Sequence, residues 1–422
     1  MMTDNSPDTS HVMDWLPRPV LLLVVARAVN QLGAFSLPFL AVLLVTQRGA
    51  SLGAAGLVVA VFGAATIPSR LAGGRLTQAI GARRTMVLGL LACAAAQLAI
   101  AAAPGLRTTL VAVAVLGLAF EIYEPASQSL VADLSAPEHR PRTFGVLGAA
   151  LSLGGLLGGL LATAVGGLDL RLLFAVDAAT CLVCAVVVRL GLPGGRTTPT
   201  HQDRTGPAVR PWRDRRLLVM LAAGTGFATL YLQLVITLPL TLVARAIPVE
   251  RYGLVLALSA LVVVAAQPVL GSRRLPEDPF TVMAIGYVVL AVGLGLTAYV
   301  GSLAGFLVAT VVWALGDVLL LGHPFVVVAG LAPAGTSARY LAVYGTCWGL
   351  AGVLAPLAGT AVLVAAGPGV LWTGCAVLAL VLAGLQPAVR RAVLRSDESR
   401  AARTNSSANP RRRRPRSRRM VG

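Results

Sequence analysis

Residues 303–328 read LAGFLVATVVWALGDVLLLGHPFVVV, and Asp317 is the single formally charged residue in this run. A helix needs about 20 predominantly apolar residues to cross roughly 30 Å of hydrocarbon, so the run is long enough to span a membrane. The whole chain has the same character: hydrophobic residues make up 56%, charged residues 12%, and the mean hydropathy is +0.79. This composition is typical of a polytopic membrane protein and excludes a soluble globular domain.

Twelve such apolar runs occur, in two sets of six on either side of an arginine-rich segment. They cover 20–45, 52–71, 86–103, 110–132, 144–165 and 172–188, and then 217–243, 254–270, 282–300, 303–328, 341–365 and 370–385. We therefore predict an all-α membrane protein with twelve transmembrane helices in two six-helix pseudo-repeats. Its expected parts are an N-terminal cytoplasmic segment (1–17), a six-helix bundle (18–192), a cytoplasmic linker (193–215), a second six-helix bundle (216–390) and a basic, disordered cytoplasmic tail (391–422).

The distribution of arginine predicts the orientation of the chain. Short arginine-rich loops stay in the cytoplasm during insertion, and an even number of spans places both termini on one side. With cytoplasmic termini, the outer loops carry only Arg48, Arg107, Arg171, Arg245 and Arg251. The net charge of +18 lies in loops and the tail rather than on a folded basic face, so nucleic acid is not an expected partner. All 35 basic residues are arginine, which indicates a high-GC bacterial genome and thus a plasma-membrane location.

The two halves are related by an internal repeat. Pro38 and Pro239 are 201 positions apart, Pro125 and Pro324 are 199 apart, Arg140 and Arg339 are 199 apart, and Gly74 and Gly271 are 197 apart. Because each half has an even number of spans, duplication keeps the same orientation in both halves. Such a pair encloses a polar cavity near the middle of the membrane, which rocking of the halves exposes to each side in turn.

The segment 73–84, GGRLTQAIGARR, resembles the loop between the second and third helices of the major facilitator superfamily, whose pattern is G-x-L-x-D-R-x-G-R-R/K. Gln78 and Ala79 replace the usual Asp-Arg, and Ala82 also departs from the pattern. The resemblance implies the major facilitator fold. It also implies a role in conformational change for loop residues, namely Gly74, Gln78, Gly81, Arg83, Arg84, Arg140 and Arg339.

Further segments are similar to the multidrug-efflux branch of this superfamily: 131–134 leading to 137–140, 331–333 leading to 339–340, and 174–180. Drug:proton antiporters of the branch carry a glycine ladder that ends G-P-x-x-G-G in the fifth helix. Here 153–159 read LGGLLGG, with Gly159 at the place of the proline. Two interpretations are open for Gly154, Gly155, Gly158 and Gly159: close helix packing, or a role as a hinge or in blocking leaks.

Ionisable groups inside spans are costly unless they face protein or water, so they indicate function. Glu121, Glu124 and Gln128 lie three and four residues apart and share one helix face. Two carboxylates this close do not both ionise cheaply in a low dielectric, so we expect Glu121 and Glu124 to exchange a proton. The alternative is a structural pair with Arg27. Expected substrate-binding residues are Arg27, Asn30, Gln128, Tyr231, Gln267, Trp313 and Asp317.

Other chemistry is missing from the sequence. With no lysine in the chain there is no P-loop, and no catalytic triad or metal-ligand cluster emerges, so we expect neither an enzyme nor a cofactor or metal. The C-x-x-C of Cys181 and Cys184 has no second pair, so we expect it to pack as small apolar residues. Asp177 and His323 are expected to be structural.

These observations predict a secondary active transporter that exports small amphiphilic compounds, as in drug or antibiotic efflux, in exchange for protons and by alternating access. Its partners would be a small-molecule substrate, protons and the lipid bilayer, and we expect a monomer. The departure at Gly159 leaves a metabolite importer or facilitator of the same superfamily as one alternative. A membrane sensor that keeps the fold without transporting is another.

Overall fold

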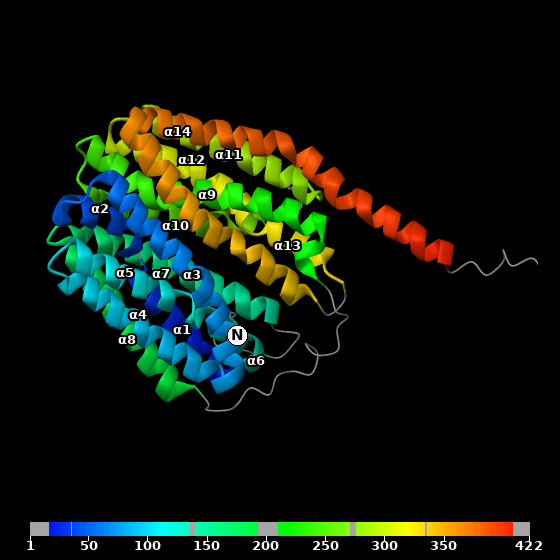
Figure 1. The fold of residues 1–422 in the computed structure, drawn as a ribbon, viewed down its shortest axis with the longest axis horizontal. Helices are drawn as coiled ribbons and strands as arrows, with labels where there is room; N and C mark the ends of the chain where they lie inside the picture. The colour runs from blue at the N-terminus through cyan, green and yellow to red at the C-terminus, as the bar shows by residue number, and fades with distance from the viewer. Residues whose placement is uncertain are drawn as a thin grey trace, which may run out of the picture.

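A computed structural model describes residues 17–34, 36–135, 140–192, 210–270, 276–333 and 336–407, and within these ranges the chain is helical (Figure 1). The N-terminal half contains α1 (Arg18–Gly33), α2 (Ser36–Arg48), α3 (Leu52–Ile80), α4 (Ala82–Ala102), α5 (Leu106–Phe120), α6 (Tyr123–Leu134), α7 (Arg140–Gly166) and α8 (Leu170–Gly191). The C-terminal half contains η3 (Pro211–Arg213), α9 (Arg215–Ala244), η4 (Val249–Arg251), α10 (Tyr252–Leu270), α11 (Pro279–Tyr299), α12 (Leu303–Leu321), α13 (His323–Leu331) and α14 (Ser337–Ser407). The all-α prediction is confirmed.

The described residues contain 11 segments that are long and apolar enough to cross a membrane, and the last of them holds two crossings. That segment, Tyr340–Leu394, has 55 residues, which at about 1.5 Å per residue is far longer than a bilayer is thick. Gly367 interrupts it with a φ of 79°, a value that favours glycine, and Pro368 follows. The chain folds back there, which brings the number of crossings to the predicted twelve.

Two crossings are broken at corresponding places in the two halves. α5 ends before Glu121 and α6 begins at Tyr123, while α12 ends before Gly322 and α13 begins at His323. Pro125 and Pro324 explain both breaks, because a proline lacks the N–H that would bond to the carbonyl four residues earlier. Broken helices in corresponding positions of two repeats indicate a binding site between the halves.

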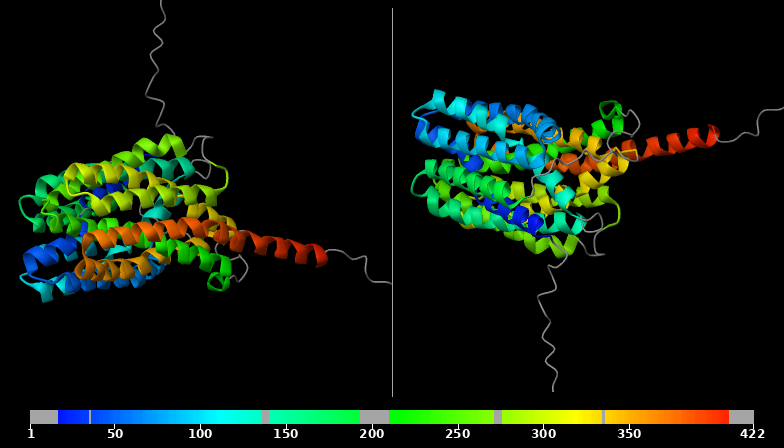
Figure 2. Two further views of the ribbon diagram at one scale, coloured as in Figure 1. Left: turned by 90° about the horizontal axis from the view of Figure 1, so that it is seen from above. Right: turned by 90° about the horizontal axis from the view of Figure 1, so that it is seen from below.

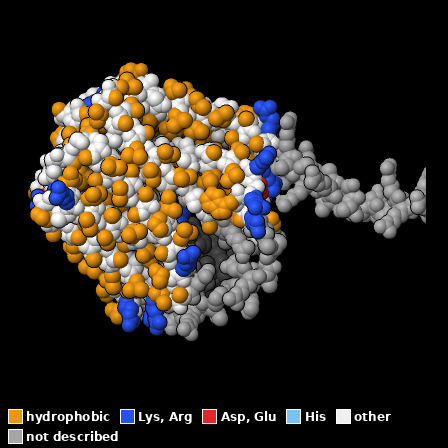
Figure 3. Space-filling view, viewed as in Figure 1, with side chains coloured by type: hydrophobic (Ala, Val, Ile, Leu, Met, Phe, Trp, Pro, Cys, Tyr) orange, Lys and Arg blue, Asp and Glu red, His pale blue; other side chains and the backbone are white. Residues whose placement is uncertain are grey.

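The helices run roughly parallel, and those of residues 18–191 lie beside those of residues 211–407 (Figures 1 and 2). We call the side where α1 begins and α9 begins the terminal side, and the other side the opposite side. The halves meet mainly along two helix pairs, α3 with α14 and α7 with α10, and α2 also contacts α9. Large apolar side chains are exposed over the flanks of the bundle, and arginines gather at its ends (Figure 3). This distribution fits a belt that faces lipid.

The halves approach most closely on the opposite side. A Cβ added to Gly63 would lie 2.3 Å from the carbonyl oxygen of Gly352, and one added to Gly159 would lie 2.5 Å from that of Gly253. Gly74 on α3 lies 11 residues closer to the terminal side than Gly63, and Gly148 on α7 lies 11 residues closer than Gly159. Eleven residues are about three helical turns, so the two glycines of each helix share one face. Among the described residues, a Cβ at either Gly74 or Gly148 would meet nothing within 4 Å. The halves are thus closed on the opposite side and separate toward the terminal side.

Two stretches differ from the sequence-based expectation. α3 continues to Ile80, so most of 73–84 is helix and the turn is confined to Gly81, whose φ is 88°. No glycine-type conformation or proline interrupts the chain between Pro68 and Gly81, which accounts for the longer helix.

α14 continues through Ser407, so residues 391–407 are helical where disorder was predicted (Figure 1). Alanine and arginine in this stretch favour a helix. Residues 1–16, 193–209 and 408–422 lie outside the described residues.

We predict that Gly63→Val disfavours closure on the opposite side by about 1–3 kcal/mol, because its side chain would overlap the backbone of α14. Spin labels at Leu168 and Tyr299, which are 79% and 82% exposed on that side, would report the effect as a longer distance between the halves. Gly74→Val is the matched control and should leave the distance unchanged. An unchanged distance in Gly63→Val would contradict the proposed contact.

Asp214 fixes the start of α9 outside the membrane. Its Oδ1 accepts from the backbone N–H of Arg216 at 3.0 Å, and its Oδ2 accepts from the Tyr340 hydroxyl of α14 at 3.0 Å. Partial burial opposes ionisation, but the hydrogen bonds from Arg216 and Tyr340 outweigh it and hold the pKa of Asp214 below its ordinary value.

A lowered pKa in the folded state means that this contribution to stability is present above the unfolded pKa, about 3.9, and is lost as the pH falls through the folded value. We therefore expect the stability difference between wild type and Asp214→Asn to be constant near neutral pH and to shrink below about pH 4. Thermal unfolding in detergent across this pH range measures it. A difference that grows with acid would contradict the assignment.

Candidate functional site

Two ion pairs lie beside the break between α5 and α6. The Nη2 of Arg27, from α1, is 2.7 Å from the Oε2 of Glu124, and the Nη2 of Arg70, from α3, is 3.1 Å from the Oε2 of Glu121. The break places both acids here: Glu121 follows the end of α5, and Glu124 stands in the first turn of α6, where a helix favours negative charge. The backbone N–H of Glu121 donates to the Ser69 hydroxyl at 3.0 Å, which fixes the turn.

The first pair is enclosed by three further contacts of α1 and α6. The Arg27 side chain is 6% exposed, donates to the Oδ1 of Asn30 at 3.1 Å and lies 5.0 Å from the ring centroid of Tyr123. Gln128 donates to the Oε1 of Glu124 at 3.2 Å. The structure thus brings together four residues that the sequence predicted as site residues, and it pairs Glu124 with Arg27 as the structural alternative expected. Tyr123 is new, since an aromatic residue in a span gives no signal of its own.

The second pair is more open and reaches the other half of the protein. The side chain of Arg70 is 37% exposed and that of Glu121 is 20% exposed. The Nη1 of Arg70 also donates to the carbonyl oxygen of Gly345 in α14, at 3.5 Å. Arg70 therefore contacts both halves at once. Arg70 is not among the predicted site residues, although it falls inside the predicted span 52–71 and could have been recognised as an ionisable group within the membrane.

A buried polar network extends from Arg27 toward the opposite side. The amide of Asn30 donates to the Cys181 sulfur at 3.3 Å, and the Cys181 thiol donates to Oδ1 of Asp177 at 3.7 Å. Ser36 and Gln97 donate to the other oxygen of Asp177. Since Ser36 begins α2, Asp177 also holds the break between α1 and α2. This arrangement supports the structural role predicted for Asp177 and the packing role predicted for Cys181.

In the middle of the C-terminal half, the described residues present aromatic side chains where the N-terminal half has ion pairs. Phe227, Tyr231, Tyr287 and Trp348 form a cluster with ring centroids 5.3 to 6.4 Å apart, contributed by α9, α11 and α14. Tyr231 and Trp348 are partly exposed. Tyr231 also lies close enough to Asp317 of α12 for an electrostatic interaction.

The remaining predicted residues fall into three groups. Trp313 is buried, and its backbone packs against Gly293 of α11. Arg83 donates to the carbonyl oxygen of Leu192 at 2.7 Å, which ties the start of α4 to the end of α8, and Arg84 is exposed. The side chains of Gln78, Arg140, Gln267 and Arg339 lie outside the described residues.

The glycines of α7 pack in two directions. A Cβ at Gly154 would lie 2.6 Å from the carbonyl oxygen of Ala28 in α1, within the same half, whereas Gly159 faces α10 of the other half. A Cβ added to Gly155 would lie 3.9 Å from the Cβ of Ala260 in α10, and Gly158 is buried. These contacts favour the packing interpretation of the ladder, and Gly159 takes part in the contact between halves.

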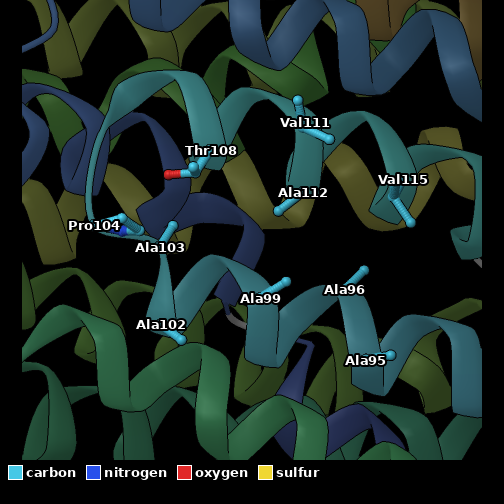
Figure 4. A pocket seen from close by; sticks show the side chains of 10 residues that line it. All are labelled: Ala95, Ala96, Ala99, Ala102, Ala103, Pro104, Thr108, Val111, Ala112 and Val115. Carbon is cyan, nitrogen blue, oxygen red and sulfur yellow. The ribbon is translucent and has the colours of Figure 1, made fainter.

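An apolar hollow of about 430 Å³ lies between α4 and α5 near the opposite side (Figure 4). It is lined by Ala95, Ala96, Ala99, Ala102, Ala103, Pro104, Thr108, Val111, Ala112 and Val115. None of these side chains carries a charge, and the ion pairs lie elsewhere, where α1 and α3 meet the break between α5 and α6. Within the part of the chain that the structure describes, no group of three or more His, Cys, Asp or Glu side chains could hold a metal ion.

Twelve crossings in two similar halves, with ionisable side chains near the breaks of corresponding helices, define a polytopic membrane protein of the transporter class. Residues 23–356 match the sequence model of the Major Facilitator Superfamily, and the chain belongs to that superfamily. It is therefore a multi-pass membrane transporter rather than an enzyme, and its partners include a small-molecule substrate and the membrane.

Known proteins support the same assignment. The "uncharacterized MFS-type transporter YhjO" of Bacillus subtilis (strain 168) is 28% identical over 385 residues, which cover 87% of this chain and 92% of that protein. "Multidrug resistance protein MdtH" of Cronobacter sakazakii is 28% identical over 167 residues, which cover 40% of this chain and 42% of that protein. A solved POT family transporter in complex with a thioalcohol-conjugated peptide has a TM-score of 0.76 at 12% identity, and the match covers 90% of this chain and 97% of that one. This last likeness shows the fold alone.

We predict that Glu124→Gln lowers the free energy of unfolding by about 3–5 kcal/mol, because it leaves the buried Arg27 without its counter-charge. Glu121→Gln is the matched control: Arg70 is partly exposed, so solvent screening should limit the loss to about 1 kcal/mol or less. Thermal unfolding of the purified variants in one detergent measures both. Equal losses would mean that burial does not distinguish the two pairs.

Proposed function

We propose that this transporter exports small amphiphilic compounds in exchange for protons, with Glu121 as the acid that carries the proton and Glu124 as the acid that holds Arg27. The observation that carries the proposal is the position of the Glu121–Arg70 pair, partly exposed and in contact with α14 of the other half. A proton on Glu121 removes the charge that holds Arg70 and so alters a contact between the halves. That connection between protonation and the relative position of the halves is what an antiporter requires.

The two acids have different parts in this proposal. Glu124 is clamped by Arg27, which is buried, and it accepts from Gln128, so a proton there would have to displace a strong ion pair. Glu121 has a partly exposed partner and fewer contacts, so it exchanges its proton more readily. Glu121 is therefore the proposed proton carrier, and Glu124 keeps Arg27 in place.

Amphiphilic substrates fit the surfaces beside the pairs. Tyr231 and Trp348 offer partly exposed aromatic faces in one half, and Phe120 and Tyr123, with ring centroids 6.5 Å apart, offer them in the other. The polar groups for orientation are those of the proposed substrate site, namely Arg27, Asn30, Gln128, Gln267 and Asp317. Apolar walls with a few polar groups are typical of small-molecule sites. The partial similarity to MdtH is consistent with drug efflux.

The proposed orientation places the terminal side in the cytoplasm of a bacterial cell, because the arginine-rich loops lie on that side. The separation of the halves toward the terminal side would then give access from the cytoplasm, which is the side from which an exporter collects its substrate. We propose that the monomer is the transporting unit, since each chain contains both halves.

The first test is the susceptibility of an efflux-deficient bacterial host to a broad panel of antibiotics and dyes. Cells would carry wild type, the Glu121→Gln/Glu124→Gln variant or an empty vector, at matched membrane levels. We expect resistance to some compounds with wild type only. The compounds identified then serve in sealed vesicles under an imposed pH gradient.

In those vesicles we expect Glu121→Gln to abolish acceleration of export by the gradient, because the side chain can no longer bind and release a proton. Glu124→Gln should instead reduce transport together with protein stability. Full gradient dependence in the double variant would rule out the coupling assignment. Uptake driven by the gradient would support an importer, and binding without movement across the vesicle would support a sensor.

A further inference from the structure

Asp317 is the isolated acid of the C-terminal half. Along 217–244, 252–270, 279–299, 303–331 and 340–389, which form the crossings of that half, it is the one residue with a formal charge. It lies in α12, which packs against α10, α11 and α13. The residue is 2% exposed, and its Oδ1 has no hydrogen-bond partner among the described residues.

The described membrane-spanning residues of the elements that pack against α12 include no arginine. Their titratable residues include Tyr252 of α10, Tyr287 of α11 and His323 of α13, and Tyr231 lies on α9. The Tyr252 hydroxyl donates a hydrogen bond to the carbonyl oxygen of Leu234. A ring nitrogen of His323 forms a hydrogen bond with the carbonyl oxygen of Leu319, one helical turn earlier in the chain. Tyr231 is the neighbour with an electrostatic interaction with Asp317, and a phenol supplies no counter-charge.

The acids of the N-terminal half are arranged in the opposite way. Glu121 and Glu124 each lie within 3.1 Å of an arginine, and Asp177 accepts hydrogen bonds from Ser36, Gln97 and Cys181. An ionised carboxylate without a counter-charge or donors is expensive in a low dielectric, and such a group binds a proton instead. The surroundings of Asp317 leave the neutral acid as the form that fits.

We propose that Asp317 holds a proton in this conformation and is a second proton-binding site, located in the C-terminal half and separate from Glu121. The proton enters from water and leaves to water when movement of the half hydrates the carboxyl group, and no other bond forms or breaks. The proton site itself does not depend on the proposed export, but its part in coupling rests on that function. With Glu121, it would give each half one exchangeable proton.

Infrared spectroscopy of the purified protein at neutral pH tests the site without any substrate. We expect the spectrum of wild type minus that of Asp317→Asn to contain a carbonyl band of a protonated carboxylic acid. The band should lie at the high-frequency end of its range, because Oδ1 accepts no hydrogen bond, and it should shift in heavy water. Asp177→Asn is the matched control, since a hydrogen-bonded acid cannot give a band at that position. No such band in wild type, or a band that Asp317→Asn retains, overturns the proposal.

Two further measurements separate this site from the proposed function. Asp317→Glu keeps an acid at the position and should keep a protonated band at neutral pH even if Asp317→Asn does not fold; its absence counts against the site. In vesicles, Asp317→Asn should lose part of the acceleration of export by the gradient, and Asp317→Glu should keep it. If no compound is exported, the infrared band still decides whether Asp317 holds a proton.

Discussion

The structure depends on one constraint: water is missing from the bilayer interior, so each charge there must be paired or neutralised. The N-terminal half meets the constraint by pairing Arg27 with Glu124 and Arg70 with Glu121. These four charges sum to zero within one half. The C-terminal half carries Asp317 without a cation, so that half satisfies the same constraint only with a proton or with a positive group brought from outside. The twofold repeat of the fold is therefore not a repeat of the electrostatics.

Broken helices place these groups where the halves meet. A continuous helix would bond the carbonyl oxygens near Glu121 to N–H groups one turn later, and Pro125 prevents one of those bonds. The resulting turn puts two acids at a helix end instead of along a helix face, so one reaches α3 while the other reaches α1. Pro324 breaks α12 and α13 in the same way, close to Asp317 and His323. The prolines of the repeat thus determine the location of the site, while the residues around them determine its charge.

The sequence predicted the crossings, their division into halves and much of the site, because these follow from local patterns. Apolar length identifies a span, and Glu121, Glu124, Arg27 and Asn30 stand out as polar residues within spans. The sequence did not predict which acid meets which arginine, since Arg70 and Glu121 are 51 positions apart and their contact depends on the packing of α3 against α5. Nor did it predict the aromatic groups, because Tyr123 and Trp348 look like any packed ring until neighbouring helices are placed. The end of α3 was misjudged for a local reason, as a single glycine at 81 ends the helix where a longer loop was expected.

The contacts between the halves connect closure on the opposite side with the charges near the centre of the protein. At Gly63 and Gly159 the contacts are between backbone atoms and involve no ionisable group. Their strength therefore depends on steric fit and not on protonation. Arg70 is different, because it binds an acid of one half and a carbonyl oxygen of the other. A change of charge at Glu121 therefore directly alters a contact between the halves. A change of charge at Glu124 instead alters the interactions of Arg27 and of the network that extends to Asp177. The same four-residue stretch of chain, 121–124, can thus contain one acid that responds to protons and one that keeps the half intact, and their different partners account for the difference.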